Sequence, residues 1–163
     1  MEKLEAHRAG AAHRAISVML KNSAGEILLQ QRSPAKYHAA GLWSNTCCGH
    51  PRPGENPKAA ALRRLQAELG IQCELQEAGV FQYECPVTDD LVENEWVHLF
   101  VGQYDGSVRP DPDEVAVVDW RSPTDLAELI PGQLKSVFTP WFQIYMGQLP
   151  DFVRALGTSH SSH

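Results

Sequence analysis

The chain has 163 residues, of which 43% are hydrophobic and 21% charged, a composition typical of a folded domain rather than a disordered chain. Its net charge of −6 argues against binding of nucleic acid through a generally basic surface. No apolar run approaches the ~20 residues that span a membrane, and residues 1–12 do not resemble a secretion signal. We therefore expect a cytoplasmic protein with one domain over residues 1–156 and a disordered tail over residues 157–163.

The first third of the chain is expected to be mostly β-structure. Ala15–Leu20 and Ile27–Arg32 are short runs of strand-forming residues, and the turn-forming stretch Lys21–Glu26 between them predicts a β-hairpin. A loop is expected over Pro34–Gly41. The segment after it, Trp43–Cys48, is expected to be extended.

A helix is predicted after the turn Pro51–Glu55. Asn56 is a typical N-cap residue, Pro57 suits the first helical position, and Gly70 suits the position just past the end. The apolar residues of this segment recur at helical spacing and would form its core face: Leu62, Leu65 and Leu69.

The second half of the sequence mixes strands and helices irregularly. Strands are predicted over Val80–Glu84, Trp96–Tyr104 and Val115–Trp120. Helices are predicted over Ser122–Leu129 and Pro140–Leu149. This mixture indicates an α+β or α/β fold built on a mixed sheet.

Histidines and carboxylates that could bind a divalent metal occur in three parts of the sequence. Glu93 and Glu95 are two residues apart in a predicted strand, so they share one face, and Val97 and Leu99 continue that face as apolar residues. Burying two carboxylates there is costly unless they are paired or bind a metal. Spacing alone also allows surface histidines and a solvated acidic turn. The candidate ligands are His7, His13, His50, Glu93 and Glu95.

The four cysteines have no CxxC spacing, which argues against a zinc site or a disulfide framework and for reduced thiols. They are Cys47, Cys48, Cys73 and Cys85. A thiol close to His50 could act as a nucleophile, an acid or a base. The alternative is that Cys47 and Cys48 are small buried residues at the end of a strand.

Basic residues that could hold phosphate groups are scattered along the chain. Arg32 and Lys36 follow the predicted hairpin and have no acidic neighbour in the sequence, and Lys3 is a further candidate. Arg64 and Glu68 are four residues apart, so they lie on one helix face. They form either a helix ion pair or a site where the arginine binds diphosphate oxygen directly and the glutamate binds it through Mg²⁺.

Aromatic residues add two candidates for a binding site. The tryptophans are Trp43, Trp96, Trp120 and Trp141, residues that usually pack in a core at such positions. Trp141 follows a proline at a predicted helix start and could instead close a pocket. Tyr83 lies on a predicted strand ten residues before Glu93.

A sequence pattern spanning the predicted helix resembles that of the Nudix superfamily, Gly-x5-Glu-x7-Arg-Glu-U-x-Glu-Glu-x-Gly-U, where U is aliphatic. Arg64 and Ala67 stand at two positions where the pattern has carboxylates. Nudix hydrolases use those carboxylates to hold Mg²⁺ and activate water, so their absence argues against pyrophosphate hydrolysis. The matching residues are Gly49, Glu55, Arg63, Leu65, Glu68, Gly70 and Ile71.

More narrowly, the chain resembles the type 1 isopentenyl-diphosphate Δ-isomerases from Lys3 to about Leu149. The segments that carry this resemblance are Lys3-x3-His7, Ala12–Ala15, Gln31–Arg32, Gly41–Pro51, Val92–Glu95 and Phe138–Trp141. The resemblance implies a Nudix-type α/β/α sandwich with a mixed, curved β-sheet. It also implies conversion of isopentenyl diphosphate to dimethylallyl diphosphate in isoprenoid biosynthesis, by a 1,3-allylic shift through a tertiary carbocation.

The resemblance further implies a role for each candidate residue. Cys48 and Glu95 would be acid and base on opposite faces of the substrate, with Tyr83 supporting Glu95. Trp141 would stabilise the carbocation, and Glu68 would hold a diphosphate-bound Mg²⁺. The diphosphate would be bound by Lys3, Arg32, Lys36 and Arg64. A second metal, Mn²⁺, Zn²⁺ or Mg²⁺, would be bound by His7, His13, His50, Glu93 and Glu95.

Two other functions are left open at this stage. A Nudix hydrolase of a nucleoside or isoprenoid diphosphate would release phosphate from its substrate. A non-catalytic binding module would have kept the fold and lost the site, whereas Cys48, Glu95 and the three histidines are all present. We expect a small-molecule diphosphate as the partner, no nucleic acid or membrane, and either a monomer or a dimer.

Overall fold

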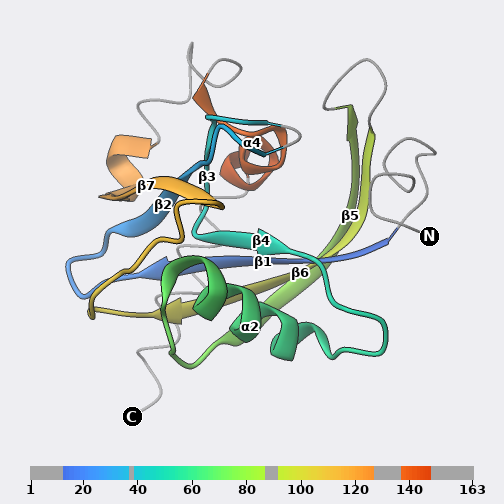
Figure 1. Cartoon of the computed structure of the whole chain (residues 1–163), viewed down its shortest axis with the longest axis horizontal. Helices are drawn as coiled ribbons and strands as arrows, with labels where there is room; N and C mark the ends of the chain where they lie inside the picture. The colour runs from blue at the N-terminus through green and yellow to red at the C-terminus, as the bar shows by residue number, and fades with distance from the viewer. Residues whose placement is uncertain (1–12, 37–38, 87–91, 127–136, 148–163) are drawn as a thin grey trace.

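The computed structural model describes residues 13–36, 39–86, 92–126 and 137–147. In these ranges the chain forms an open mixed sheet with helices, the α+β class that the sequence predicts. The elements, in chain order, are β1 (His13–Lys21), β2 (Ile27–Arg32), β3 (Trp43–Ser44), β4 (Cys47–Gly49), α2 (Pro57–Leu69), β5 (Gln76–Pro86), β6 (Val92–Gln103), β7 (Val115–Arg121) and α4 (Pro140–Gly147) (Figure 1).

The sheet has β1 near its centre, and its main path runs in the order β3-β2-β1-β6-β5. β1 and β6 are parallel and paired from His13 opposite Glu95 to Lys21 opposite Gln103. The other strand pairs are antiparallel, and β4 and β7 lie off the main path, against β1 and β2 respectively.

The predicted hairpin of the first two strands is confirmed only next to its turn. β1 and β2 pair at Lys21 and Ile27, after which they separate and β4 takes over the pairing with β1. The hydroxyl of Thr46 bridges the separation, accepting a hydrogen bond from Leu20 N at 2.9 Å and donating one to Leu28 O at 2.7 Å. The two strands therefore enclose a short polar segment instead of continuing as a ladder.

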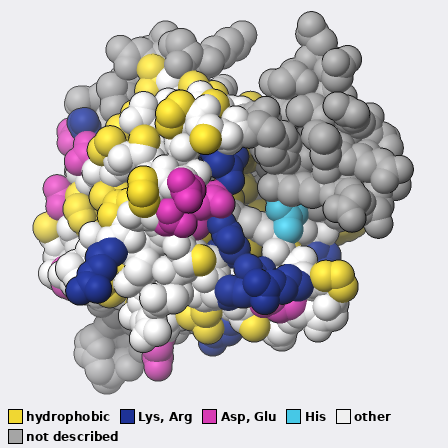
Figure 2. Space-filling view, viewed as in Figure 1, with side chains coloured by type: hydrophobic (Ala, Val, Ile, Leu, Met, Phe, Trp, Pro, Cys, Tyr) yellow, Lys and Arg dark blue, Asp and Glu magenta, His cyan; other side chains and the backbone are white. Residues whose placement is uncertain are grey.

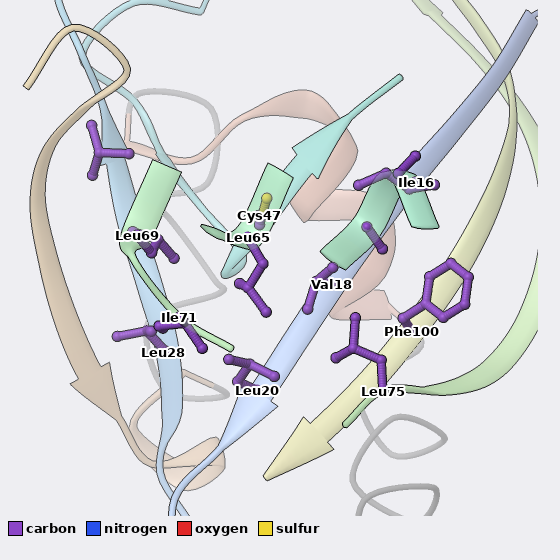
Figure 3. Close-up of a cluster of buried hydrophobic side chains, with 13 residues drawn as sticks. Ile16, Val18, Leu20, Leu28, Cys47, Leu65, Leu69, Ile71, Leu75 and Phe100 are labelled. Carbon is purple, nitrogen blue, oxygen red and sulfur yellow. The ribbon is translucent and has the colours of Figure 1, made fainter. Parts of the chain in front are cut away.

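The sheet is covered on both faces, as a three-layer α/β/α sandwich requires, with α2 on one face and α4 on the other (Figure 1). Because side chains alternate along a strand, β1 contributes to both cores. The core under α2 includes Ile16, Val18, Leu20, Leu65, Leu69, Ile71 and Phe100 (Figure 3). The core under α4 includes Ala15, Met19, Val97, Leu99, Trp141 and Phe142.

The ends of α2 are those predicted from the sequence. The side chain of Asn56 accepts hydrogen bonds from Lys58 N at 2.8 Å and from Ala59 N at 3.3 Å. Gly70 adopts the left-handed conformation, with φ of 65°, and so ends the helix with a residue that has no Cβ to strain.

The predicted core face of this helix is wrong in one residue. Leu62 is 36% exposed, whereas Leu65 and Leu69 are fully buried. The buried stripe runs instead through Ala61, Leu65 and Leu69, with Glu68 beside it, because the small Ala61 lets the helix approach the sheet closely. Leu62 lies to one side of the contact.

Several strand boundaries differ from the prediction. β5 and β6 are longer than predicted, because their antiparallel ladder continues through the acidic stretch, from Gln76 opposite Val101 to Pro86 opposite Val92. The segment Trp43–Cys48 forms two short strands separated at Asn45 and Thr46. Trp96 is 48% exposed and does not belong to the core.

Part of the predicted organisation lies outside the described residues. Residues 123–126 are helical, as predicted, and α4 is described up to Gly147. Residues 127–129, 148–149 and the tail 157–163 fall outside these ranges, and the single domain over residues 1–156 remains a prediction. Within the described ranges, no helix has the length and apolar character needed to cross a membrane.

A substitution at Asn56 tests whether its side chain stabilises the start of α2. Asn56→Ala should lower the free energy of unfolding by about 1 kcal/mol, because two backbone N–H groups lose their acceptor. Urea denaturation would measure the change. Asn56→Asp keeps an acceptor in the same place and should stay within about 0.5 kcal/mol of the parent. Equal loss in both variants would contradict the capping role.

Candidate active site

The two adjacent cysteines of β4 lie on opposite faces of the sheet. Cys47 is fully buried in the core under α2, where Figure 3 shows its sulfur close to Leu65. Burial raises the pKa of the Cys47 thiol, and the nearby charge of Glu68 adds to this effect. Cys48 is only partly buried and packs against the core under α4. Cys48 is therefore the thiol on the face that carries Trp141.

A chain of buried and partly buried hydrogen bonds connects Cys48 to Trp141. The indole Nε1–H of Trp141 donates to Ser44 Oγ at 2.8 Å, and Ser44 Oγ donates to Asn45 Oδ1 at 2.9 Å. The thiol of Cys48 donates to the same Oδ1 over 3.2 Å. Two residues predicted for the site from separate parts of the sequence are thus linked through a segment to which sequence reasoning gave no role.

The orientation of Asn45 follows from its surroundings. Its Nδ2 lies 2.8 Å from Val18 O and 3.3 Å from Cys47 O, two carbonyls that can only accept hydrogen bonds. The amide oxygen must therefore face Cys48 and Ser44. The sequence did offer a signal for this role, because three polar residues in a row, residues 44–46, interrupt a predicted strand.

Arg32 and Trp141 form a further contact between predicted site residues. The guanidinium carbon of Arg32 lies 5.1 Å from the centroid of the Trp141 ring, within the range of a cation–π interaction. Trp141 is only 4% exposed. A basic residue predicted to bind diphosphate is thus stacked on the ring predicted to stabilise a carbocation.

Strand register brings three more predicted residues into one row of the sheet. The backbone of Glu95 in β6 pairs with His13 in β1 on one side and with Tyr83 in β5 on the other. Glu93 pairs with Cys85. For these residues the structure describes the backbone, which places positions 93 and 95 on the same face of β6 as the buried Val97 and Leu99.

His50 follows directly after β4, and its backbone carbonyl accepts a hydrogen bond from Arg63, the arginine of α2 that matches the Nudix pattern. Arg63 donates from Nη2 to the His50 carbonyl at 3.3 Å and to Glu55 Oε1 at 2.9 Å. The hydrogen bond from Arg63 lowers the pKa of Glu55 to about 2, so this carboxylate stays charged in neutral solution. The pair fixes the turn between β4 and α2.

Arg64 and Glu68 form the ion pair that their spacing allows. Arg64 Nη2 lies 2.6 Å from Glu68 Oε2, and the Glu68 side chain is buried. Gln30 Nε2 donates to the other oxygen, Glu68 Oε1, at 3.0 Å. The ion pair is thus observed, while the phosphate and Mg²⁺ roles of these two residues remain predictions.

Lys36 has no acidic residue near it in the sequence, but the structure gives it an acidic partner. Its ammonium group forms an ion pair with Glu114, the residue just before β7. The two residues are far apart in the sequence, so no local pattern reveals the pair. Lys3 and His7, by contrast, lie outside the described residues.

The comparisons with known proteins agree with this architecture. The sequence model of the NUDIX domain matches residues 11–142. The crystal structure of the MutT protein from Methanosarcina mazei Go1 has a TM-score of 0.70 and 20% identity, covering 85% of this chain and 93% of that chain. The MutT NUDIX hydrolase from Burkholderia pseudomallei has a TM-score of 0.66 and 21% identity, with 84% and 97% coverage. The chain is a NUDIX-domain protein, as its sequence pattern predicts.

Curated relatives identify the family within this class. The isopentenyl-diphosphate Delta-isomerase of Burkholderia multivorans is 48% identical over 141 residues, which are 86% of this chain and 80% of the relative. That of Streptomyces coelicolor is 48% identical over 162 residues, 97% of this chain and 81% of the relative. The chain belongs to the isopentenyl-diphosphate Delta-isomerase family, and the predicted resemblance is confirmed.

The close approach of Gly49 to Arg64 yields a stability prediction. A Cβ at position 49 would lie 2.9 Å from Arg64 Cγ, closer than real contacts allow. Gly49→Ala should therefore lower the free energy of unfolding by about 1–3 kcal/mol, as overpacking does, in urea denaturation. Gly147→Ala is the matched control, because nothing lies within 4 Å of a Cβ there.

Repeating Gly49→Ala in an Arg64→Ala protein shows whether the Arg64 side chain causes the loss of stability. In an Arg64→Ala protein the clashing Cγ is absent, so Gly49→Ala should cost markedly less than in the parent. An equal loss in both backgrounds would exclude the Gly49–Arg64 contact as its origin.

Proposed function

We propose that the protein interconverts isopentenyl diphosphate and dimethylallyl diphosphate, the reaction that gives its family its name. The observation that carries the proposal is the hydrogen-bonded connection of Cys48 to Trp141 on one face of the sheet, together with the stacking of Arg32 on that tryptophan. A thiol, a buried aromatic ring and an arginine, which we propose binds phosphate, are thereby held in one unit.

The reaction moves a double bond without changing the composition of the substrate. A proton adds to the terminal alkene carbon, and another proton leaves the carbon next to the one that bears oxygen. The alkene is unactivated, so the positive charge develops on the tertiary carbon between them. The protein must therefore offer an acid and a base on opposite sides of the substrate and keep water away from the cation.

Cys48 and Glu95 are the proposed acid and base. Support for Cys48 comes from its partial burial on the face of Trp141, in contrast to the fully buried Cys47. Support for Glu95 comes from its register beside His13 and Tyr83 in the next strands, which makes Tyr83 a suitable partner for the Glu95 carboxyl.

Trp141 is proposed to stabilise the carbocation. An indole face attracts a desolvated cation by roughly 2 kcal/mol or more and offers no nucleophile that would trap it. The ring is held by its hydrogen bond to Ser44 and is almost completely buried. A buried site also limits the access of water, which would convert the cation to an alcohol.

Lys3, Arg32, Lys36 and Arg64 are proposed to bind the diphosphate. Support comes from Arg32 at the end of β2, Lys36 in the loop after it and Arg64 on α2. Glu114 connects two of them through its contacts to Lys36 and Arg64. A local cluster of this kind explains how a chain with a net charge of −6 binds an anionic substrate.

Divalent metals are proposed at two places. Glu68 is proposed to hold Mg²⁺, which prefers oxygen ligands shared with substrate phosphates. Arg64 and Gln30 contact its two carboxylate oxygens, so the ion would share these oxygens with them. The nitrogen and oxygen donors of the second set fit Mn²⁺, Zn²⁺ or Mg²⁺, and the register of His13 beside Glu95 supports this grouping. A metal at the second set would orient the Glu95 carboxyl. The second set is His7, His13, His50, Glu93 and Glu95.

Hydrolysis of a diphosphate is less well supported than isomerisation. Two carboxylate positions of the Nudix pattern are Arg64 and Ala67, and Arg64 is engaged with Glu68. The curated relatives reported above carry the isomerase name. We further propose that the enzyme acts in the cytoplasm on a small-molecule diphosphate, without nucleic acid or membrane as a partner.

Proton NMR of isopentenyl diphosphate in D₂O with Mg²⁺ tests the reaction itself. We expect dimethylallyl diphosphate that carries deuterium from solvent in a methyl group, because the added proton comes from an exchangeable side chain. Release of phosphate or of an isoprenoid monophosphate without isomerisation would instead indicate a hydrolase. Absence of both products would indicate a binding module.

The two adjacent cysteines supply a matched pair of variants. Cys48→Ala should lower the rate of isomerisation by about 10²–10⁴-fold, the contribution expected of a proton-transferring side chain. Cys47→Ala should retain activity, because Cys47 lies in the opposite core. Both rates follow from the same NMR assay, with the melting temperature as the check on folding. Wild-type turnover in the Cys48 variant would remove it from the mechanism.

A further inference from the structure

Three of the proposed diphosphate-binding cations reach one region from different elements. Arg32 ends β2, Lys36 follows it in a loop, and Arg64 lies on α2. Figure 2 shows that basic side chains lie on either side of an acidic group on the face that carries α2. Like charges gathered in a partly buried region repel one another, so this arrangement needs a compensating charge.

Glu114 contacts two of these cations with its two carboxylate oxygens. Lys36 Nζ forms an ion pair with Oε2, and Arg64 Nη2 lies 3.7 Å from Oε1. Partial burial raises the pKa of Glu114. The nearby charges of Lys36, Arg64 and Arg32 lower it by more, so the pKa lies below its ordinary value. The carboxylate is therefore charged at neutral pH and bridges the cations.

The backbone of Glu114 is tied to both elements that carry the cations. Its carbonyl accepts a hydrogen bond from Ser33 N at 3.0 Å, next to the end of β2. Its N–H donates to Asp111 O at 2.9 Å, and Asp111 N donates to Glu68 O at 2.8 Å, in the last turn of α2. The carboxylate thus has a fixed position relative to β2 and to α2.

We propose that Glu114 is a positioning residue for substrate: it sets the spacing of Lys36 and Arg64 so that they match a diphosphate rather than any other anion. This inference rests on the proposed function, because it takes the cations as the diphosphate site. Glu114 itself carries the wrong charge to bind the substrate. It would act through the two side chains that it contacts, Lys36 directly and Arg64 at 3.7 Å, with Glu68 as the closer partner of Arg64.

Two effects of Glu114 on anion binding can be separated, its negative charge and the spacing that it gives the two cations. Removing one negative charge strengthens the attraction of the site for every anion, whereas losing the fixed spacing weakens only the anion that spans both cations. Glu114→Gln should therefore bind sulfate more tightly and bind inorganic diphosphate no more tightly than the parent. The preference for diphosphate over sulfate should fall about tenfold, since a misplaced group of this kind costs up to ~10²-fold.

Isothermal titration calorimetry with inorganic diphosphate and with sulfate measures this preference without requiring turnover. Glu74→Gln is the control, because Glu74 is exposed and the variant has the same net charge as Glu114→Gln. It should leave the preference unchanged. If both anions tighten by the same factor in Glu114→Gln, Glu114 acts only as a charge and the proposal is overturned.

Steady-state kinetics with isopentenyl diphosphate add a second readout. Glu114→Gln should lower kcat about tenfold with little change in KM, because the substrate still binds but is misaligned. The drop should be smaller in a Lys36→Met background, where one positioned cation is already absent. An unchanged kcat, or equal drops in both backgrounds, would overturn the positioning role.

The two proposals can fail separately. A wild-type protein that binds diphosphate selectively but does not isomerise its substrate would refute the proposed function, and the calorimetric comparison would still decide the role of Glu114. A wild-type protein that shows no preference for diphosphate would refute the positioning role directly.

Discussion

The separation of β1 from β2 is the constraint on which the site depends. Two strands joined by a tight turn would ordinarily continue to pair, and here the hydroxyl of Thr46 replaces the missing ladder bonds by joining Leu20 N to Leu28 O. The buried amide of Asn45 performs the same task for Val18 O. Because a buried polar group without a partner is costly, these hydrogen bonds hold the polar segment firmly in a core that is otherwise apolar.

The short strand β4 follows from that separation and divides the chemistry between the two faces. It pairs with β1 in the opened space, so alternation along three residues sends Cys47 to one core and Cys48 to the other. Gly49 then leaves room for the side chain of Arg64. Cys48 and Arg64, two of the proposed site residues, are thus brought to one short strand.

The sequence predicts well what is local and poorly what depends on distant contacts. The caps of α2 and the Arg64–Glu68 pair follow from residues within one turn of each other. The exposure of Leu62 depends on how the helix lies on the sheet, which helical spacing alone does not define. Similarly, the pairing of Lys36 with Glu114 joins residues separated by nearly half of the chain, and the role of Asn45 requires a strand separation that propensities do not reveal.

The parallel pairing of β1 with β6 has a consequence for the folding of the enzyme. His13 and Glu95 are neighbours across this pair, although about half of the chain lies between them. Contacts between residues so far apart in sequence form slowly, because a long loop must be closed before they are gained. A register shift of one residue would also move Glu95 to the opposite face. The residues proposed to bind metal and to transfer protons come from both halves of the chain, so activity during refolding should report the completion of the central sheet.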